Sequence, residues 1–164
     1  MQRVGGQEAI AALAQPKRLA LLAYLAAATP YGFHRRDTIL ALFWPEADQE
    51  HARTALRKAV HFLRHELGPG VVLSRGDEEI GLAEEDIWCD VRKFGQALAK
   101  GRLSEALGLY PGDLLAGLFV SDAPQFEHWL DEERGRLRTR PTSPFSARAG
   151  RLGGPRRLGT STCA

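Results

Sequence analysis

Apolar residues recur at every third or fourth position through the front of the chain, a spacing typical of amphipathic helices. A first helix is expected over residues 16–28, because Pro16 suits the first turn of a helix. A second is expected at about 34–43 and ends before Pro45, since a residue that precedes proline avoids the helical conformation. A third, longer helix is expected at about 49–67. The front of the chain is therefore predicted to be helical.

After the third helix, the pattern changes to two short β-prone runs, at 71–74 and 79–82, around a Gly-Asp turn. This pattern predicts a β-hairpin. A hairpin after three helices gives the order of a winged helix-turn-helix domain, which we expect within residues 1–86. Arg75 is suited to contact DNA from this wing, whereas three neighbouring acids would be repelled by DNA: Asp77, Glu78 and Glu79. The wing is therefore expected to contribute weakly.

The rear of the chain predicts short helices joined by tight turns. One helix is expected to begin at Asp90 as its cap, another lies at about 103–110, and a third opens at Asp122 and runs to about residue 138. Such helical pairs resemble a tetratricopeptide-like scaffold, expected as a partial helical domain over residues 87–138. The expected fold class is mainly α, a winged helix-turn-helix with a small β-hairpin wing followed by this tetratricopeptide-like domain.

The net charge of +2 conceals an uneven distribution along the chain. Residues 1–70 carry nine Lys/Arg and six Asp/Glu, whereas residues 71–101 carry four and seven. Residues 102–140 carry five and seven, and residues 141–164 carry four Arg and no acid. This asymmetry is typical of a nucleic-acid-binding module joined to a protein-binding module, although counts this small also vary by chance.

The third helix carries a stripe of cationic residues opposite its apolar stripe. The cationic stripe and its flanks consist of Arg53, Thr54, Arg57, Lys58, His61, Arg64 and His65. A helix of this kind can lie in a major groove, where Arg pairs two donors with a guanine edge and Lys or His reaches phosphates. Arg35 and Arg36 precede it and are expected to anchor phosphates. The alternative is an ordinary solvated basic face.

Seven runs of sequence carry a family resemblance: residues 15–25, 36–45, 52–60, 63–68, 88–91, 110–115 and 126–130. The first four resemble the helices of SARP-type regulators (Streptomyces antibiotic regulatory proteins). The last three look like the bacterial transcriptional activator domain that follows in this family. The resemblance spans about residues 13–138.

The resemblance implies an OmpR-like winged helix that binds promoter DNA, often at direct repeats. It also implies an activator domain that mediates contacts within a homodimer or with RNA polymerase. By resemblance, the DNA contacts are Arg53, Thr54, Arg57, Lys58, His61 and Arg64, the face that the helical spacing also selects.

Both ends of the chain depart from the family pattern. The family begins with a small antiparallel sheet, but only 15 residues precede Pro16, so this sheet is expected to be reduced or absent. Residues 139–164 are rich in Arg, Pro and Gly and have few large apolar side chains, so we expect a disordered basic tail. The chain is therefore interpreted as a shortened regulator, and a frameshifted or truncated reading frame is one hypothesis for the tail.

Motifs for catalysis or metal binding are not found in the sequence. His61 and His65 have helical spacing, but no third ligand accompanies them. Cys89 is expected to be a small core residue, and core positions are also expected for the tryptophans, Trp44, Trp88 and Trp129. The chain is therefore expected to be no enzyme and to use no cofactor or metal.

No apolar run reaches the length of a membrane helix, and the N-terminus lacks a signal-peptide pattern. Two cysteines far apart in sequence fit a reducing cytoplasm. The expected function is a cytoplasmic, sequence-specific DNA-binding transcriptional activator, with the helix at about 49–67 in the major groove. Two alternatives stay open: a protein-interaction module without DNA affinity, in which the winged helix is a dimerisation surface, and a truncated, non-functional remnant.

Overall fold

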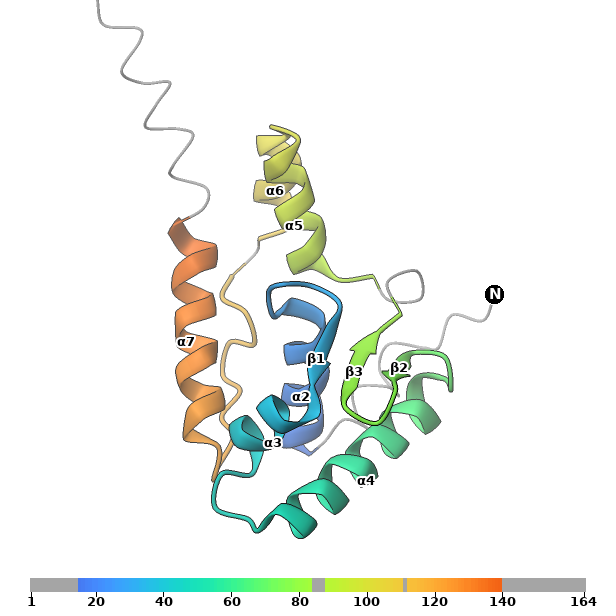
Figure 1. The fold of residues 1–164 in the computed structure, drawn as a ribbon. Helices are drawn as coiled ribbons and strands as arrows, with labels where there is room; N and C mark the ends of the chain where they lie inside the picture. Colours follow the sequence, from blue (N-terminus) through green and yellow to red (C-terminus); the bar gives the residue numbers. More distant parts are fainter. Residues whose placement is uncertain (1–14, 84–87, 111, 140–164) are drawn as a thin grey trace, which may run out of the picture.

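The computed structural model describes residues 15–83, 88–110 and 112–139. In chain order its elements are α2 (Pro16–Ala27), β1 (Phe33–Arg35), α3 (Arg36–Phe43), α4 (Gln49–Leu67), β2 (Val72–Arg75), β3 (Glu79–Leu82), α5 (Asp90–Ala99), α6 (Leu103–Gly108) and α7 (Pro124–Thr139). The described part is mostly helical, with one small antiparallel sheet, so the mainly α class is confirmed (Figure 1).

The three helices expected at the front of the chain are present, and α4 has the predicted limits. The helix α4 begins where predicted because the side chain of Asp48 accepts a hydrogen bond from the His51 N–H, at 2.9 Å. It ends at Gly68, whose φ of +111° a residue with a side chain rarely adopts. The cap and the terminal glycine therefore fix both ends of the helix.

The sheet has the order β1-β3-β2, and the hairpin of β2 and β3 was expected. The strand β1 was not expected, because the second helix was predicted from about residue 34 and instead begins at Arg36. In β1, Phe33 pairs with Gly81 of β3. A Cβ at position 81 would lie 2.6 Å from the Gly32 carbonyl oxygen, so this close approach requires the glycine.

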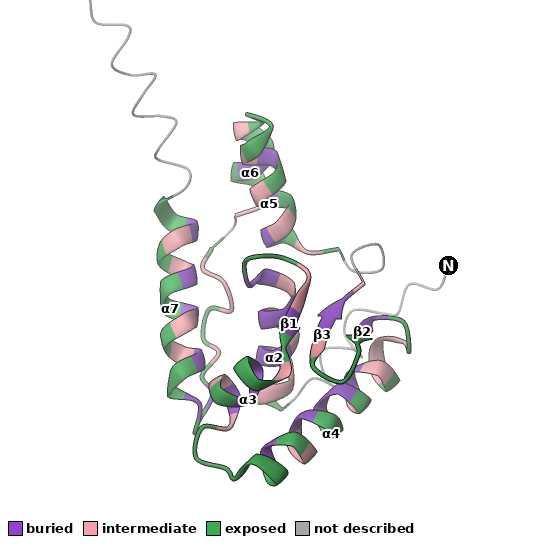
Figure 2. Cartoon of the chain, viewed as in Figure 1, coloured by how far each residue is buried: buried purple, intermediate pink, exposed green. Residues whose placement is uncertain are grey.

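The main core is formed by α2, α3, α4 and the sheet, and α7 closes it from the other end of the chain. Phe126 of α7 is fully buried, with its ring centroid 4.9 Å from that of Phe43 in α3. Trp129 packs its ring 4.9 Å from Tyr24 of α2. The division at residue 86 stays a prediction, but residues from both sides of it share this core (Figure 2).

A second, smaller core joins α5 and α6 to the end of α2 and to Leu137. Arg92 of α5 donates from Nε to the Ala26 carbonyl oxygen at 2.7 Å, which ties α5 to the C-terminal end of α2. Cys89, rather than Asp90, is the N-cap residue of α5, because Asp90 already has helical geometry. Cys89 itself is half-buried against this core, in line with the expectation.

Two further expectations for the rear half, besides the cap at Asp90, are wrong. Trp88 is 68% exposed, so it is not a core residue, whereas Trp44 and Trp129 pack against the main core. The last helix begins at Pro124, since Asp122 has a φ of +60°, outside the helical region.

The expected reduction of an N-terminal sheet concerns residues 1–14, which lie outside the described residues. The helix α7 continues through Thr139, one residue into the expected tail, and residues 140–164 also lie outside the described part. Within residues 15–83, 88–110 and 112–139, no helix is both long and apolar enough to cross a membrane.

Candidate nucleic-acid interface

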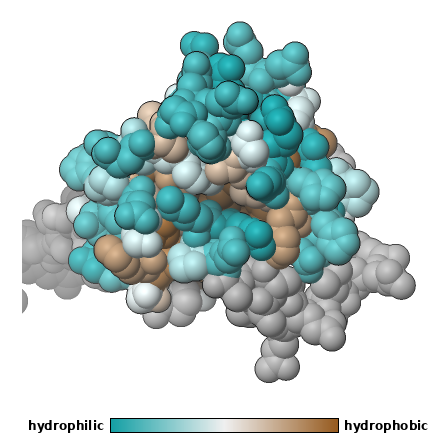
Figure 3. All heavy atoms as spheres, turned by 90° about the horizontal axis from the view of Figure 1, so that it is seen from below, coloured by the Kyte–Doolittle hydropathy of each residue, from teal (hydrophilic) through white to brown (hydrophobic). Residues whose placement is uncertain are grey.

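The exposed side of α4 carries the cations that the sequence places there. The buried side of the helix consists of Ala52, Leu56, Ala59, Val60 and Leu63, which pack on the main core. Helical spacing then turns the intervening polar residues outward, and Arg53, Arg57, Lys58 and His61 are exposed. Exposed positions alternate with buried ones along α4 (Figure 2). Seen from the α4 side, the molecule is covered mostly by hydrophilic residues (Figure 3).

Three of these cations have no acidic partner among the described residues. Arg53, Arg57 and Lys58 form no ion pair within this part of the chain. Exposed cations that are not neutralised locally can contact the phosphates or base edges of a nucleic acid. Thr54 lies beside them and is half-buried.

Arg64 lies on the same helix but has a different environment. It is half-buried, and its Nε donates to the Val72 carbonyl oxygen at 2.9 Å. Its Nη2 donates to Ser74 Oγ at 3.0 Å. Arg64 therefore ties α4 to the strand β2 instead of extending freely into solvent.

Arg36 approaches the same strand from α3. Its Nη2 donates to Ser74 Oγ at 3.2 Å, while its Nε is buried and has no hydrogen-bond partner within the described structure. Burial lowers the pKa of Arg36, the positive charge of Arg64 lowers it further, and Asp77 acts in the opposite direction. A cavity of about 610 Å³ lies between α3, α4 and the hairpin turn, next to these groups.

The two remaining predicted contacts, Arg35 and Arg75, are both beside acidic residues. Arg35 lies 4.0 Å from Glu78, and both side chains are largely exposed. Arg75 donates from Nε to Glu79 at 2.5 Å, and its guanidinium lies over the Phe33 ring, 4.7 Å from the centroid. The hydrogen bond to Glu79 raises the pKa of Arg75. These partners reduce the net positive charge that the hairpin presents.

Sequence reasoning missed Ser74, whose hydroxyl joins Arg36 and Arg64. The signal available was its place in a short β-prone run, but nothing in the sequence shows that β2 lies against both arginines. Among the described residues, no three His, Cys, Asp or Glu side chains come together as metal ligands.

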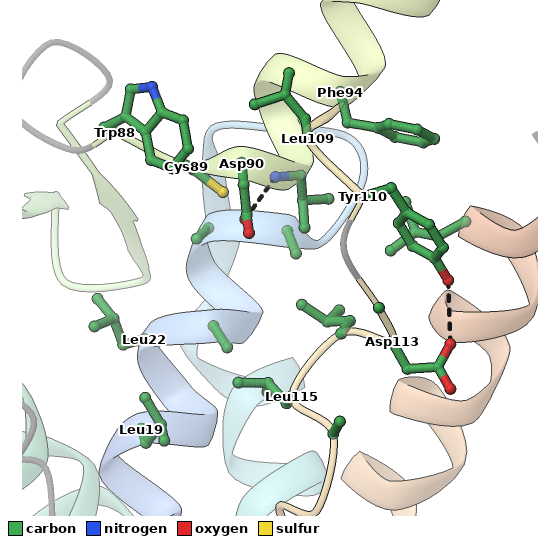
Figure 4. A pocket seen from close by; sticks show the side chains of 18 residues that line it. Leu19, Leu22, Trp88, Cys89, Asp90, Phe94, Leu109, Tyr110, Asp113 and Leu115 are labelled. Atoms are coloured by element: carbon green, nitrogen blue, oxygen red, sulfur yellow. Dashed lines mark hydrogen bonds between the residues drawn. The ribbon is translucent and has the colours of Figure 1, made fainter. Parts of the chain in front are cut away.

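A second feature that was missed is an apolar cavity of about 470 Å³ between α2, α5 and the segment after α6. Its lining includes Leu19 and Leu22 of α2, Phe94 of α5 and Leu109, which follows α6 (Figure 4). At one side, the Tyr110 hydroxyl donates to Asp113 at 3.1 Å.

Comparisons with protein-family models, curated proteins and solved structures found no match. The resemblance to SARP-type regulators therefore stays a prediction.

Proposed function

We propose that this protein is a sequence-specific DNA-binding transcriptional regulator with a winged helix-turn-helix fold. The order helix, strand, helix, helix, strand, strand, with the sheet order β1-β3-β2, supports this architecture. In this proposal α3 and α4 are the helix-turn-helix pair, α4 is the recognition helix, and β2 and β3 are the wing.

The observation that carries the proposal is the exposed cationic side of α4. Arg53, Arg57 and Lys58 are exposed and lack ion-pair partners among the described residues, and His61 lies beside them. In the major groove, Arg53, Arg57 and His61 would read base edges and Lys58 would contact a phosphate. The fixed apolar side of α4 would hold these side chains in register with the bases.

The hairpin has a smaller role in this proposal. Arg75 and Arg35 already interact with Glu79 and Glu78, so a phosphate that approached them would also meet the acids. The helices α5, α6 and α7 would form the partial tetratricopeptide-like activator domain, with contacts to a homodimer partner or to RNA polymerase in the cytoplasm.

Selection from genomic DNA fragments at physiological salt tests the proposal. We expect the purified chain to enrich fragments that share one sequence motif. The variant R53Q/R57Q/K58Q is expected to lose this enrichment. The exposed cations Lys93, Lys100 and Arg102 lie away from α4 and provide a matched control. The control K93Q/K100Q/R102Q removes the same charge from the α5 and α6 side and is expected to retain enrichment. Failure of the unaltered chain to enrich any fragment would reject DNA recognition.

A second candidate function is a protein-interaction module without DNA affinity. The apolar cavity between α2 and α5 and the acidic partners of Arg35 and Arg75 favour it. This candidate predicts no enrichment in the same selection, together with a concentration-dependent sedimentation coefficient if the partner is a second copy of the chain.

A further inference from the structure

Two guanidinium groups from different helices meet at one hydroxyl group. Nη2 of Arg36 and Nη2 of Arg64 donate to Ser74 Oγ, at 3.2 and 3.0 Å. A serine oxygen has two acceptor lone pairs and one hydrogen. Both lone pairs are occupied here, so the Ser74 oxygen holds the two guanidinium groups next to each other.

The positive charges of Arg36 and Arg64 lie close together, and neither forms an ion pair with an acid among the described residues. Burial lowers the pKa of Arg36 and the nearby charge of Arg64 lowers it further, while Asp77 acts in the opposite direction. An anion placed between the two guanidinium groups would relieve the repulsion between their charges.

Most of the hydrogen-bond donors of the pair are still free. A guanidinium has five N–H donors, of which Arg64 uses two and Arg36 uses one in bonds within the described residues. The Nε of Arg36 is buried without an acceptor. Such a surplus of converging donors suits an oxyanion with several acceptor oxygens.

Arg36 and Arg64 both line the cavity of about 610 Å³ beside α4, which is large enough for a phosphate group, whereas Ser74 lies outside its lining. Arg57 and His61 line the same cavity, so a phosphate there would lie next to the side chains that face the bases. Asp37, Asp77 and Glu78 also line it. These acids limit the total positive charge and disfavour the entry of more than one phosphate.

The geometry points to a preassembled site for a single phosphate group, formed by Arg36 and Arg64, which the Ser74 hydroxyl holds side by side. The inference rests on the proposed function in taking that group to be a phosphodiester of the DNA backbone. A soluble phosphate has the same chemistry at this site, and the experiment separates the two sources. Ser74 acts as a positioning residue, because it holds both guanidinium groups.

The test measures the affinity for a labelled DNA duplex as a function of salt concentration. Each neutralised phosphate contributes about 0.9 to the slope of log K against log salt. We expect R36Q, R64Q and R36Q/R64Q each to lower the slope by about one, because the two arginines share one phosphate. The control R102Q removes an exposed Arg far from the site and should leave the slope unchanged. The inference would be overturned if R36Q and R64Q leave the slope unchanged. It would also be overturned if the double variant lowers the slope by twice as much as either single variant does.

R36Q carries the test by itself, because Arg64 also holds the backbone of β2 and its loss can destabilise the hairpin. Thermal melting of each variant separates a folding defect from lost phosphate contact. Titration with inorganic phosphate in the absence of DNA tests whether the site binds free phosphate. If the chain binds phosphate saturably, R36Q abolishes this binding and the chain binds no DNA, the phosphate site is confirmed and the proposed function is rejected.

The positioning role of Ser74 has its own readout. S74A keeps both charges but removes the oxygen that holds the two guanidinium groups, so we expect the salt slope to be unchanged while affinity falls by roughly two- to tenfold. S74T restores the hydroxyl and should restore affinity. An S74A variant with unaltered affinity would exclude a positioning role for Ser74.

Discussion

Arg57 and Arg64 lie on the same helix, but their surroundings differ. Arg57 is exposed and has no ion-pair partner within the described residues, whereas Arg64 is half-buried and bonded to β2. A side chain that is free to move can adapt to a base edge, and one that is anchored presents a fixed charge. The proposed division between base contact and phosphate contact follows from this difference.

Replacement of Arg57 by alanine tests the base contact. If its guanidinium makes two hydrogen bonds to a guanine, R57A should weaken binding to the selected DNA by about 1–3 kcal/mol and relax the preference at one base pair. Fluorescence anisotropy with the selected duplex and its single-base variants measures both. R102A, on an exposed position before α6, is the matched control, and an R57A variant with unchanged affinity and preference would exclude this contact.

Asp113 provides a prediction about acid stability at the residue scale. Its side chain accepts from Arg138 Nε at 2.8 Å and from the Tyr110 hydroxyl, and the Arg138 bond lowers the pKa of Asp113 to about 2. Because the carboxylate is favoured in the folded state, its contribution is present above about pH 4 and is lost as the pH falls towards 2.

We therefore expect D113N to lower Tm at neutral pH and to flatten the fall of Tm between about pH 4 and pH 2. Thermal melts followed by circular dichroism across this range give the comparison. D131N removes an exposed carboxylate from α7 and serves as the control. Identical acid profiles for D113N and the unaltered chain would show that this pair does not stabilise the fold.

At the scale of the element, α4 depends on its first turn. Asp48 satisfies the His51 N–H, which would otherwise lack a partner within the helix, and this bond lowers the pKa of Asp48. We expect D48A to lower Tm by a few degrees and D48S to lower it less, because serine also caps a helix. Equal melting of D48A and the unaltered chain would contradict the role of the cap.

How far an element can be predicted from the sequence depends on where its partners lie. The limits of α4 can be predicted because its apolar stripe, its cap and Gly68 are all local signals. The strand β1 cannot be predicted in this way, because its three residues are too few to show an alternating pattern. Its pairing partner, β3, also lies far along the chain. The exposure of Arg53 and Arg57 likewise follows from helical spacing, whereas the bonds of Arg64 to β2 arise only in the folded chain.

At the scale of the whole molecule, the two halves of the sequence are joined by α7. Phe126 is fully buried and lies against Phe43, so the core beneath the proposed recognition helix depends on a residue distant in sequence. The helical period of residues 124–139 does not by itself show which core Phe126 enters.

F126A should therefore destabilise the entire described fold, by about 3–5 kcal/mol, as expected for loss of a buried phenylalanine. Chemical denaturation followed by circular dichroism measures the change. Phe119 is 70% exposed, so F119A removes the same side chain from the surface and should change stability by less than about 0.5 kcal/mol. Comparable losses in the two variants would show that α7 does not close the core.

In the proposed function, α4 enters the major groove of specific DNA. Guanine N7 lies in that groove, so its methylation should interfere with the contact. Methylation interference on a selected fragment measures this directly. We predict that N7 methylation of guanines within the bound site blocks binding by the unaltered chain, and that R57A becomes insensitive at one of them. If no methylated guanine weakens binding, α4 does not contact guanine in the major groove.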